Sequence, residues 1–453
     1  MVRPVVEVAP FRAWEYNPAK ADPRAVVSPP YDIVSENDFK DLKKASPYNL
    51  VHVTLVPARK KATKKNPDPL LEADQVLARW VSEGVLLPTR DEVVYAYECQ
   101  YLYRNETRRM RGVLLRLRLD PTYTQVLPHE EIFPKPSEER MRLLRATGVD
   151  LEPIQLLYSG KSAEETLWAY VDGSQRPPDL ALPGRDGALH KYWRINDAAV
   201  IGTVVEGFKG RKAYIADGHH RYAAAVRYAE ERRTREYRPS KNAPWEYKMT
   251  LFVNAADPGL LILPTHRLVK KAKVHAAAKL IPAWEKDFIV HTLKIVPGQP
   301  VTQLTQALEK AVGDHLVGAW LGDPRTAYLL EARLPVVPQE VVPGKSHTYR
   351  TLDVVYLQRL ALSQAMGVPE KDWGDAVGYT RSDDDAAEAM RSKKAVAVLT
   401  HRATRMQQLR AIADGKEKMP QKSTYFLPKT LSGVAMYPIG KAVGPPSKPR
   451  ITS

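Results

Sequence analysis

The sequence contains very little cysteine and no long hydrophobic run. Its 453 residues include one cysteine, Cys99, so no disulfide can form within the chain, which is typical of proteins in a reducing compartment. No stretch of about 18 apolar residues occurs, and this excludes a membrane-spanning helix of ordinary length. The first residues contain no apolar run of signal-peptide length. These absences predict a soluble, cytoplasmic protein without a membrane partner.

Common cofactor motifs are absent as well. The sequence contains neither the Gly/Lys pattern of a phosphate-binding loop nor the glycine pattern of a dinucleotide site. A single cysteine excludes a cysteine-rich zinc site, and no His-Glu-x-x-His pattern occurs. A nucleotide or metal site must therefore be built from other residues.

Positive charge is in excess, with a formal net charge of +16. Such an excess is found in proteins that bind nucleic acid, anionic membranes or phosphorylated ligands. Much of it lies in the short clusters 59–65, 108–111 and 232–238, where aromatic residues are not interleaved as a base-stacking surface requires. We interpret these clusters as solvated surface and do not expect a nucleic-acid partner, which would show a steep salt dependence of DNA affinity.

Strand and helix patterns alternate along most of the chain. The pattern predicts helices over 35–45, 70–83, 137–146, 198–207, 222–232, 301–312, 352–366, 383–392 and 402–415. It predicts strands over 93–101, 111–119, 153–158, 190–195, 213–216, 249–253, 260–263, 326–330 and 395–399. Interleaving of this kind favours an α/β (α+β) fold in which mixed sheets are covered by helices.

The most informative segment is 214–225. An apolar strand is predicted to end at Asp217, Gly218 permits a tight turn, and an alanine-rich helix begins almost at once. The first turn of a helix offers free N–H groups and a positive dipole end, so it favours anions. His219, His220 and Arg221 add donors at this point, while Asp217 is suited to bind Mg²⁺, orient a histidine or accept a proton. The alternative is a helix simply capped by Asp217, with surface histidines.

A second group lies on the proline-bracketed loop 127–140. His129 and Glu130 supply a base and an acid, and Lys135 and Arg140 supply cations. The alternative is a polar loop whose later carboxylates cap the following helix.

Two further loops place polar side chains beside rigid turns. Tyr31 and Asp32 follow two prolines, and Asn49 lies in the Ser-Pro-Tyr-Asn turn at 46–49; these residues are candidates for a substrate pocket, although a structural turn explains them equally well. His266 and Arg267 follow a predicted strand and are candidates for the same pocket.

Seven motifs lie at 10–14, 27–32, 46–49, 127–130, 215–222, 263–267 and 422–426. Together and in this order, they resemble the bacterial and archaeal family named domain of unknown function 1015. The resemblance covers about residues 5–440.

Within this region, Glu130, the Pro-Ile strand at 153–154 and the turn 217–221 resemble the ParB/sulfiredoxin-like fold, and free L-serine kinases in particular. An insertion over 159–212 departs from that pattern, as do Ile132 and Ala223-Ala224, where the family often carries hydroxyl or acidic residues. The resemblance implies an N-terminal α/β region at 1–125, a ParB/sulfiredoxin-like core at 126–268 and a further α/β region at 269–442. The last residues, 443–453, are rich in proline and lysine, which predicts a disordered tail.

The resemblance implies a nucleotide-dependent phosphotransferase that acts on a small hydroxyl metabolite such as free L-serine, with ATP or ADP and Mg²⁺. Glu130, Asp217 and His219 would be catalytic, with Asp217 also a Mg²⁺ ligand. Nucleotide phosphates would be held by Lys135, Arg140, Gly218, His220 and Arg221. The substrate pocket would comprise Tyr31, Asp32, Asn49, His129, His266 and Arg267. The rival hypothesis is a regulatory, non-catalytic nucleotide-binding protein, and the oligomeric state stays open.

Overall fold

A computed structural model describes residues 6–61, 63–64, 66–131, 134–161, 163–236, 238 and 240–440. The tail predicted to be disordered, 443–453, lies outside these residues. The chain divides into two compact units: the first comprises Met1–Pro128, Ile132–Leu260 and Pro428–Ser453, and the second comprises His129–Glu131 and Leu261–Leu427. The longer segment of the second unit, Leu261–Leu427, is thus an insertion into the first unit, to which the chain returns at Pro428.

The first unit contains eight α-helices among the described residues. They are α1 (Pro23–Val26), α2 (Glu36–Ala45), α3 (Val51–Thr54), α4 (Glu72–Ser82), α5 (Pro134–Thr147), α6 (Glu165–Ser174), α7 (Ala198–Phe208) and α8 (His219–Arg235). Its strands are β1 (Val8–Ala9), β2 (Trp14–Tyr16), β3 (Leu86–Pro88), β4 (Val94–Tyr103), β5 (Glu106–Arg118), β6 (Val126–Leu127), β7 (Val149–Asp150), β8 (Ile154–Tyr158), β9 (Leu180–Pro183), β10 (Leu189–Ile195), β11 (Ala213–Asp217), β12 (Tyr247–Asn254) and β21 (Tyr437–Pro438).

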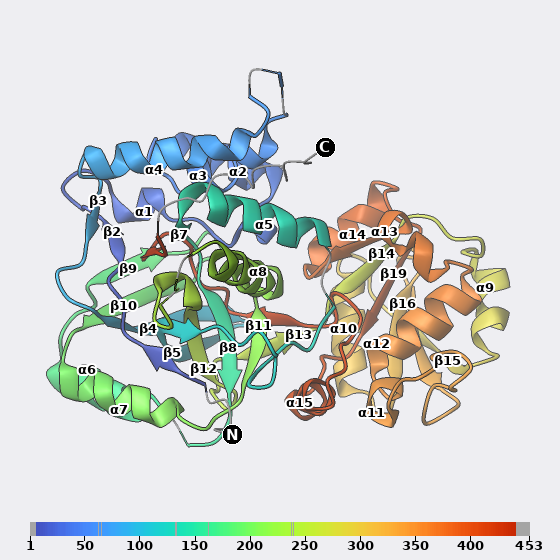
Figure 1. Ribbon diagram of the computed structural model, residues 1–453. Coiled ribbons are helices and arrows are strands. Elements are labelled where there is room, and N and C mark those ends of the chain that lie inside the picture. The colour runs from blue at the N-terminus through green and yellow to red at the C-terminus, as the bar shows by residue number, and fades with distance from the viewer. Residues whose placement is uncertain are drawn as a thin grey trace, which may run out of the picture. The chain divides into compact units, whose positions relative to one another are not determined.

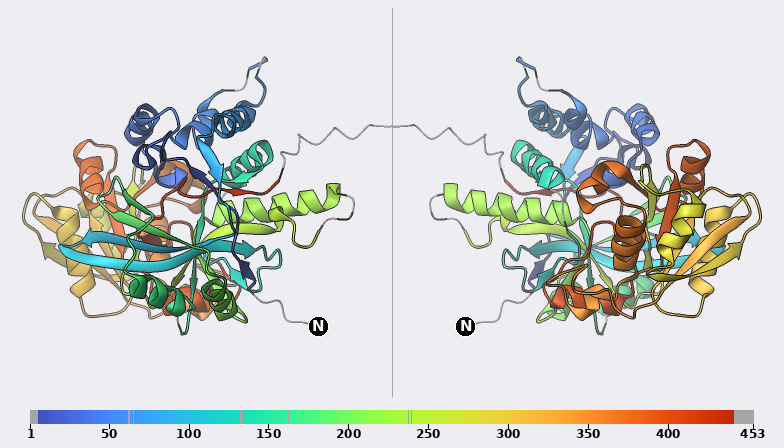
Figure 2. Two further views of the ribbon diagram at one scale, coloured as in Figure 1. Left: turned by 90° about the vertical axis from the view of Figure 1, so that its left-hand side faces the viewer. Right: turned by 90° about the vertical axis from the view of Figure 1, so that its right-hand side faces the viewer.

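A nine-stranded mixed sheet organises this unit. Its order is β6-β11-β8-β12-β5-β4-β10-β9, with β1 paired to β5; β11 is parallel to β6 and β12 to β8, and the other pairings are antiparallel. Helices α5 and α8 lie side by side on one face, and α6 and α7 on the other (Figures 1 and 2). The predicted boundary at 125/126 falls between strands that share this sheet.

Local sequence explains why these elements form. Ser35 caps α2, in the helix predicted over 35–45, through a capping box with Asp38. The β4–β5 hairpin turns at Arg104 and Asn105, both with positive φ, and joins the strands predicted over 93–101 and 111–119.

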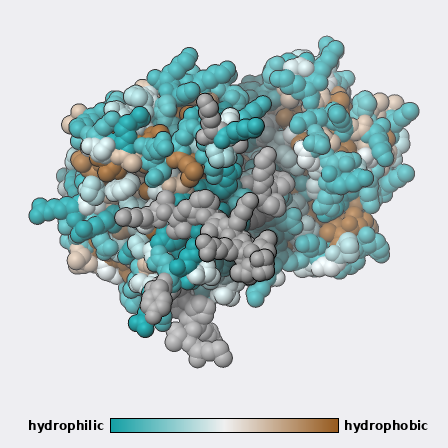
Figure 3. Space-filling view, turned by 45° about the horizontal axis from the view of Figure 1, so that its top comes forward, coloured by the Kyte–Doolittle hydropathy of each residue, from teal (hydrophilic) through white to brown (hydrophobic). Residues whose placement is uncertain are grey.

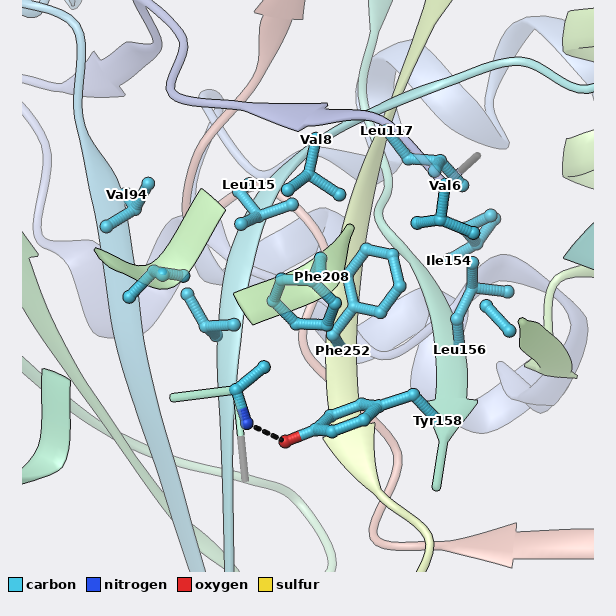
Figure 4. Packing of buried hydrophobic residues seen from close by; sticks show 14 of the residues in the cluster. Val6, Val8, Val94, Leu115, Leu117, Ile154, Leu156, Tyr158, Phe208 and Phe252 are labelled. Atoms are coloured by element: carbon cyan, nitrogen blue, oxygen red, sulfur yellow. Dashed lines mark hydrogen bonds between the residues drawn. The ribbon is translucent and has the colours of Figure 1, made fainter. Parts of the chain in front are cut away.

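The core of the first unit is made by the alternating apolar residues of the central strands. Phe208 of α7 packs against Phe252 of β12, with 4.5 Å between ring centroids (Figure 4). At the edge of the cluster, the hydroxyl of Tyr158 accepts a hydrogen bond from the backbone N–H of Ala163 at 3.0 Å, drawn dashed in Figure 4. This core fixes β8, and with it the strand β11 that leads to the turn at Gly218.

The second unit has its own sheet and helices. Its helices are α9 (Ala277–Trp284), α10 (Pro300–Lys310), α11 (His347–Arg350), α12 (Asp353–Val355), a π-helix (Tyr356–Ala365), α13 (Trp373–Ala376), α14 (Asp383–Arg391) and α15 (Met406–Asp414). Its strands are β13 (Leu261–Leu263), β14 (His266–Val269), β15 (Phe288–Lys294), β16 (Leu316–Trp320), β17 (Thr326–Ala332), β18 (Val377–Thr380), β19 (Ala397–His401) and β20 (Tyr425–Leu427).

Six of these strands form one sheet in the order β15-β17-β16-β19-β14-β18, and β13 pairs with β20. Helices α10 and α14 contact each other and cover the sheet through a cluster that includes Leu304, Trp320 and Ala387. Strand β14 lies between β18 and β19 in this sheet and pairs with both. His266 and Arg267, the first two residues of β14, are therefore buried.

Both units combine helices with sheets, so the predicted α/β class is confirmed. Among the described residues, no helix is long and apolar enough to cross a membrane. The face drawn in Figure 3 carries mostly hydrophilic residues, with small, separate hydrophobic patches.

Candidate functional site

The turn at Gly218 has the geometry that the sequence predicts. Strand β11 ends at Asp217, Gly218 adopts a φ of 90°, and α8 begins at His219. A Cβ atom added to Gly218 would lie 2.6 Å from Cγ2 of Ile154, so the backbone passes too close to β8 for any side chain. The predicted strand, tight turn and helix are therefore confirmed, and Gly218 rather than Asp217 is the residue that caps α8.

The carboxylate of Asp217 is held between two cations. One oxygen accepts from Nζ of Lys429, and the other accepts from the guanidinium of Arg221 one helical turn later. Burial alone would raise the pKa of Asp217, but the charges of Lys429 and Arg221 outweigh it and hold that pKa well below its usual range. Asp217 is thus a fixed anion that orients two basic groups.

This pairing bears on the predicted role of Asp217 as a Mg²⁺ ligand. Both carboxylate oxygens already accept from positively charged groups, so a divalent cation would have to displace Lys429 or Arg221. Among the described residues, no group of three acidic, histidine or cysteine side chains could hold a metal. The residues present do not fit a Mg²⁺ site centred on Asp217.

Arg221 is buried and only partly satisfied. Its guanidinium donates to the backbone carbonyl of Pro153 as well as to Asp217, while its Nε has no acceptor among the described residues. Burial would lower the pKa of Arg221, but Asp217 and Glu152 raise it above its usual value. The side chain stays charged, with one buried N–H group unused.

Arg140 of α5 lies in the same region and is 3% exposed. Its Nη2 donates to Glu139 at 2.5 Å, and its Nη1 lies 3.7 Å from the carboxylate of Glu152. Within the described part of the chain, neither its Nε nor its Nη1 has a hydrogen-bond acceptor. The guanidinium also lies 4.0 Å over the ring of Tyr31, which fixes its plane.

The predicted loop 28–32 therefore converges on the helix turn. Burial, and after it the charge of Asp32, raise the pKa of Tyr31, while the charges of Arg140 and Arg221 oppose the shift. The backbone N–H of Tyr31 donates to Glu152 at 3.3 Å. Tyr31, Asp32, Arg140 and Arg221 thus form one neighbourhood, although they lie far apart in the sequence.

A small cavity of about 30 Å³ lies behind the two arginines. It is lined in part by Glu152, Lys248 and Asp150, and Lys248 is ion-paired to Asp150. The volume suits a water molecule and is too small for a phosphate group. The turn itself, at Gly218, His219 and His220, is half-buried.

Asn49 has a different place. It is fully buried, and its side chain donates to the carbonyls of Ala25 and Val27 and accepts from the N–H of Val51. Its amide is used to join the 25–27 segment to α3, so it shapes the loops beneath the site.

His129 and Glu130 belong to the second unit, where they dock on the segment 419–426. The carbonyl of His129 accepts from the N–H of Met419 at 2.8 Å. The hydroxyl of Thr424 lies 2.8 Å from Nε2 of His129 and donates to Glu130 at 3.4 Å, and the N–H of Lys422 donates to the same carboxylate at 2.8 Å. Desolvation raises the pKa of Glu130 despite these donors and the charge of Lys422.

His266 and Arg267 are also in the second unit and are buried. The imidazole of His266 lies between the hydroxyl of Thr400 and the carboxylate of Asp383, 2.9 Å from each. Arg267 donates to the carbonyl of Thr265 at 2.5 Å and contacts Nε2 of His401 at 3.0 Å. His266 is held in place on both sides, whereas Arg267 keeps unused donors.

The candidate residues thus fall into two groups. The first unit brings Tyr31, Asp32, Arg140 and the 217–221 turn together, and the second unit brings Glu130, His129 and Arg267 together. The side chain of Lys135 lies outside what the structure describes. Sequence reasoning missed Lys429, Glu152, Thr424 and His401. Of these, only Thr424 lay in a motif that the family resemblance had marked.

Comparisons with known proteins gave the following. No curated protein matches the chain. Among solved structures, it is similar to a free serine kinase in complex with AMP (12% identity over 70% of this chain and 87% of the other, TM-score 0.34). It is also similar to a conserved hypothetical protein from Pyrococcus furiosus (12% identity, 70% and 90%, TM-score 0.33) and to SbnI with a C-terminal truncation from Staphylococcus aureus (11% identity, 70% and 85%, TM-score 0.33). Similarity at this level assigns no ligand to this chain.

A family model, in contrast, covers most of the chain. The model described as "Protein of unknown function (DUF1015)" matches residues 8–355. This span includes the loop with Tyr31, the His129-Glu130 pair, the turn after Asp217 and the strand with Arg267. The chain belongs to the DUF1015 family of proteins of unknown function.

Proposed function

We propose that this protein is a nucleotide-dependent phosphotransferase that acts on a small hydroxyl-bearing metabolite. One observation carries the proposal: two buried arginines, Arg140 and Arg221, have N–H donors without an acceptor among the described residues, beside the N-terminus of the 17-residue helix α8. A buried cation with unused donors is costly unless an anion binds it. A helix N-terminus favours the same ligand, so phosphate oxygens fit this turn.

Basic side chains are concentrated around the turn, as the proposal requires. Four of them, Arg140, Arg221, Lys248 and Lys429, are mostly buried. They pair with the buried acids Asp150, Glu152 and Asp217, and Arg140 also pairs with the part-exposed Glu139. The half-buried residues His219 and His220 lie in the first turn of α8.

In the proposed reaction, Glu130 is the general base. Its carboxyl is fixed by the N–H of Lys422 and by Thr424, and its pKa is raised by desolvation, which makes it a stronger base than an exposed glutamate. With ATP as donor, the acceptor oxygen bonds to the γ-phosphorus, the bond from that phosphorus to the ADP oxygen breaks, and Glu130 takes the hydroxyl proton. The chain's contribution is positioning and charge, which phosphoryl transfer chiefly requires.

The test combines calorimetry with product detection. Isothermal titration of the full chain with ATP and ADP measures binding, and mass spectrometry of reactions with a panel of hydroxyl metabolites, including L-serine, detects phosphorylated products. We expect Glu130→Gln to bind nucleotide like the wild type without forming product. Arg221→Lys keeps the charge but loses Nε and the planar fork, so it should weaken nucleotide binding about tenfold or more.

Arg233→Ala is the matched control. Arg233 is an arginine of the same helix, but it pairs with Glu246 near the helix end. This variant should bind nucleotide like the wild type. Wild-type protein that binds neither ATP nor ADP would contradict the proposal. Nucleotide binding without product from any acceptor would favour the regulatory binding protein instead.

A further inference from the structure

Arg267 is a buried cation of the second unit that has no ion-pair partner among the described residues. Its side chain is completely buried at the start of β14. Among the ion pairs of the described residues, none includes Arg267, and its Nε and Nη2 have no hydrogen-bond acceptor there. These two nitrogens form one edge of the planar guanidinium, the edge that holds a carboxylate by two parallel hydrogen bonds.

The opposite edge is fully used, which fixes the direction of the open one. Nη1 donates to the carbonyl of Thr265 at 2.5 Å and to His401 at 3.0 Å. Nδ1 of His401 lies 2.6 Å from the carbonyl of Arg402, which can only accept, so Nδ1 carries the proton and Nε2 is the acceptor for Arg267. The guanidinium also lies 5.7 Å from the ring centroid of Tyr379. Arg267 is thus held in one orientation, and its Nε–Nη2 edge has no hydrogen-bond acceptor among the described residues.

We infer that the Nε–Nη2 edge of Arg267 binds the carboxylate of a small acid. A single guanidinium matches one planar monoanion in both charge and shape, whereas a phosphate dianion would need further cations. Burial lowers the pKa of Arg267 to about 10, so the group is still protonated at neutral pH and able to bind an anion. The carboxylate would supply the missing counter-charge.

Glu130 belongs to the same unit and lies within electrostatic reach of Arg267. Its charge and that of Arg267 act on each other, since each shifts the pKa of the other group. The inference rests in part on the proposed function, and it narrows the class of acceptor for that reaction. A molecule that places its carboxylate on Arg267 and its hydroxyl at Glu130 is a hydroxy acid. This class includes hydroxy amino acids.

The test measures carboxylate binding in the absence of nucleotide. Glycolate, 3-hydroxypropionate, glycerate and serine are compared with ethylene glycol, 1,3-propanediol, glycerol and serinol, in which CH₂OH replaces the carboxylate. At about 50 mM of each compound and constant ionic strength, thermal shift and calorimetry detect binding to the full chain. We expect at least one acid to bind and its matched alcohol to bind about tenfold more weakly or not at all.

Two variants locate the site. Arg267→Lys keeps the charge but cannot form the two parallel bonds, so it should weaken acid binding about tenfold, and Arg267→Met should abolish it. Arg402→Lys is the matched control, because each of the three side-chain nitrogens of Arg402 already has an acceptor, in the carbonyls of Leu308, Gly313 and Ala311. It should bind the acid like the wild type.

The outcomes separate this inference from the proposed function. Acid binding that is lost in Arg267→Met supports the inference even if no phosphorylated product is ever found. Equal binding of acids and alcohols, retention of acid binding in Arg267→Met, or no acid binding by the wild type would overturn it. Phosphorylation of an alcohol without a carboxylate would keep the proposed function and remove the role of Arg267.

Discussion

The ion pair between Asp217 and Lys429 allows a quantitative prediction. The two side chains are 9% and 10% exposed, so the pair is largely withdrawn from water, and Arg221 shares the same carboxylate. Replacing Asp217 by Asn would leave two buried cations facing a neutral amide, which costs about 3–5 kcal/mol in comparable buried pairs. Replacing Lys429 by Met leaves the carboxylate still paired with Arg221, so we expect a smaller loss of about 2 kcal/mol.

The double variant is the decisive measurement. Independent losses would sum to about 5–7 kcal/mol, but removing both partners deletes the interaction only once. We expect the double variant to cost about 1–3 kcal/mol less than that sum. Hydrogen–deuterium exchange of peptides spanning 213–225 reports the free energy of opening of this unit, whereas a global melt would mix it with the second unit.

An exposed ion pair provides the control. Arg59 and Glu36 form a pair whose side chains are 32% and 76% exposed, so Arg59→Met should cost less than about 1 kcal/mol. Additivity of D217N and K429M within about 0.5 kcal/mol, or a loss in K429M no larger than in R59M, would refute the assignment of Lys429 to Asp217.

Three further predictions follow from the described contacts. Gly218→Ala should destabilise the first unit by about 2 kcal/mol or more, because φ is positive and the new methyl group would clash with Ile154. Gly210 also has a positive φ, 75°, but no atom lies within 4 Å of an added Cβ, so Gly210→Ala should lose only the stability that the strained backbone conformation costs. Equal losses of stability in denaturation experiments would contradict this reasoning. Burial lowers the pKa of His190 to about 4, so its neutral form stabilises the fold above the unfolded pKa of about 6.5, and this contribution, at most about 3 kcal/mol, is lost as the pH falls through 4. The double variant Tyr97→Phe/His190→Phe, which removes the ring and the hydroxyl 2.8 Å from it, should flatten the acid side of the stability profile, and an unchanged profile would show that His190 titrates normally. Thr424→Val removes a donor from Glu130, so its pKa, measured by carbon NMR titration against Glu130→Gln, should rise further; an unchanged pKa would show that this contact is absent in solution.

Local patterns predicted the local parts of the site. The apolar run before Asp217, the glycine and the alanine-rich segment are sufficient to specify strand, turn and helix, because each depends on neighbouring residues alone. The same reasoning missed β15 and β16. Strand β15 is only weakly buried and shows no clear alternation, and β16 is a five-residue apolar run whose period cannot distinguish a strand from a helix.

The partners of the site residues were not predictable in this way. Lys429 reaches Asp217 across 212 residues, and Thr424 reaches His129 across 295. Neither contact produces a periodic pattern or a helix-capping motif in the sequence, because the two segments of chain meet only in the folded protein. For Asn49 the local pattern predicted too much. A polar residue in a rigid turn suggested a contact to substrate, but the side-chain amide of Asn49 is hydrogen-bonded to nearby backbone groups.

The return of the chain to the first unit at Pro428 has a consequence for synthesis. At about 5–20 residues per second, Lys429 is made roughly 10–40 s after Asp217. Throughout that interval the nascent chain holds β11, α8 and Arg221, but it lacks the second cation for the buried carboxylate and the strand β21 that pairs with β7. The first unit begins before the second and is completed after it. Ribosome-bound chains that stop before Pro428 should therefore be cleaved by proteases within 213–235, although nearly all of that unit has already been translated.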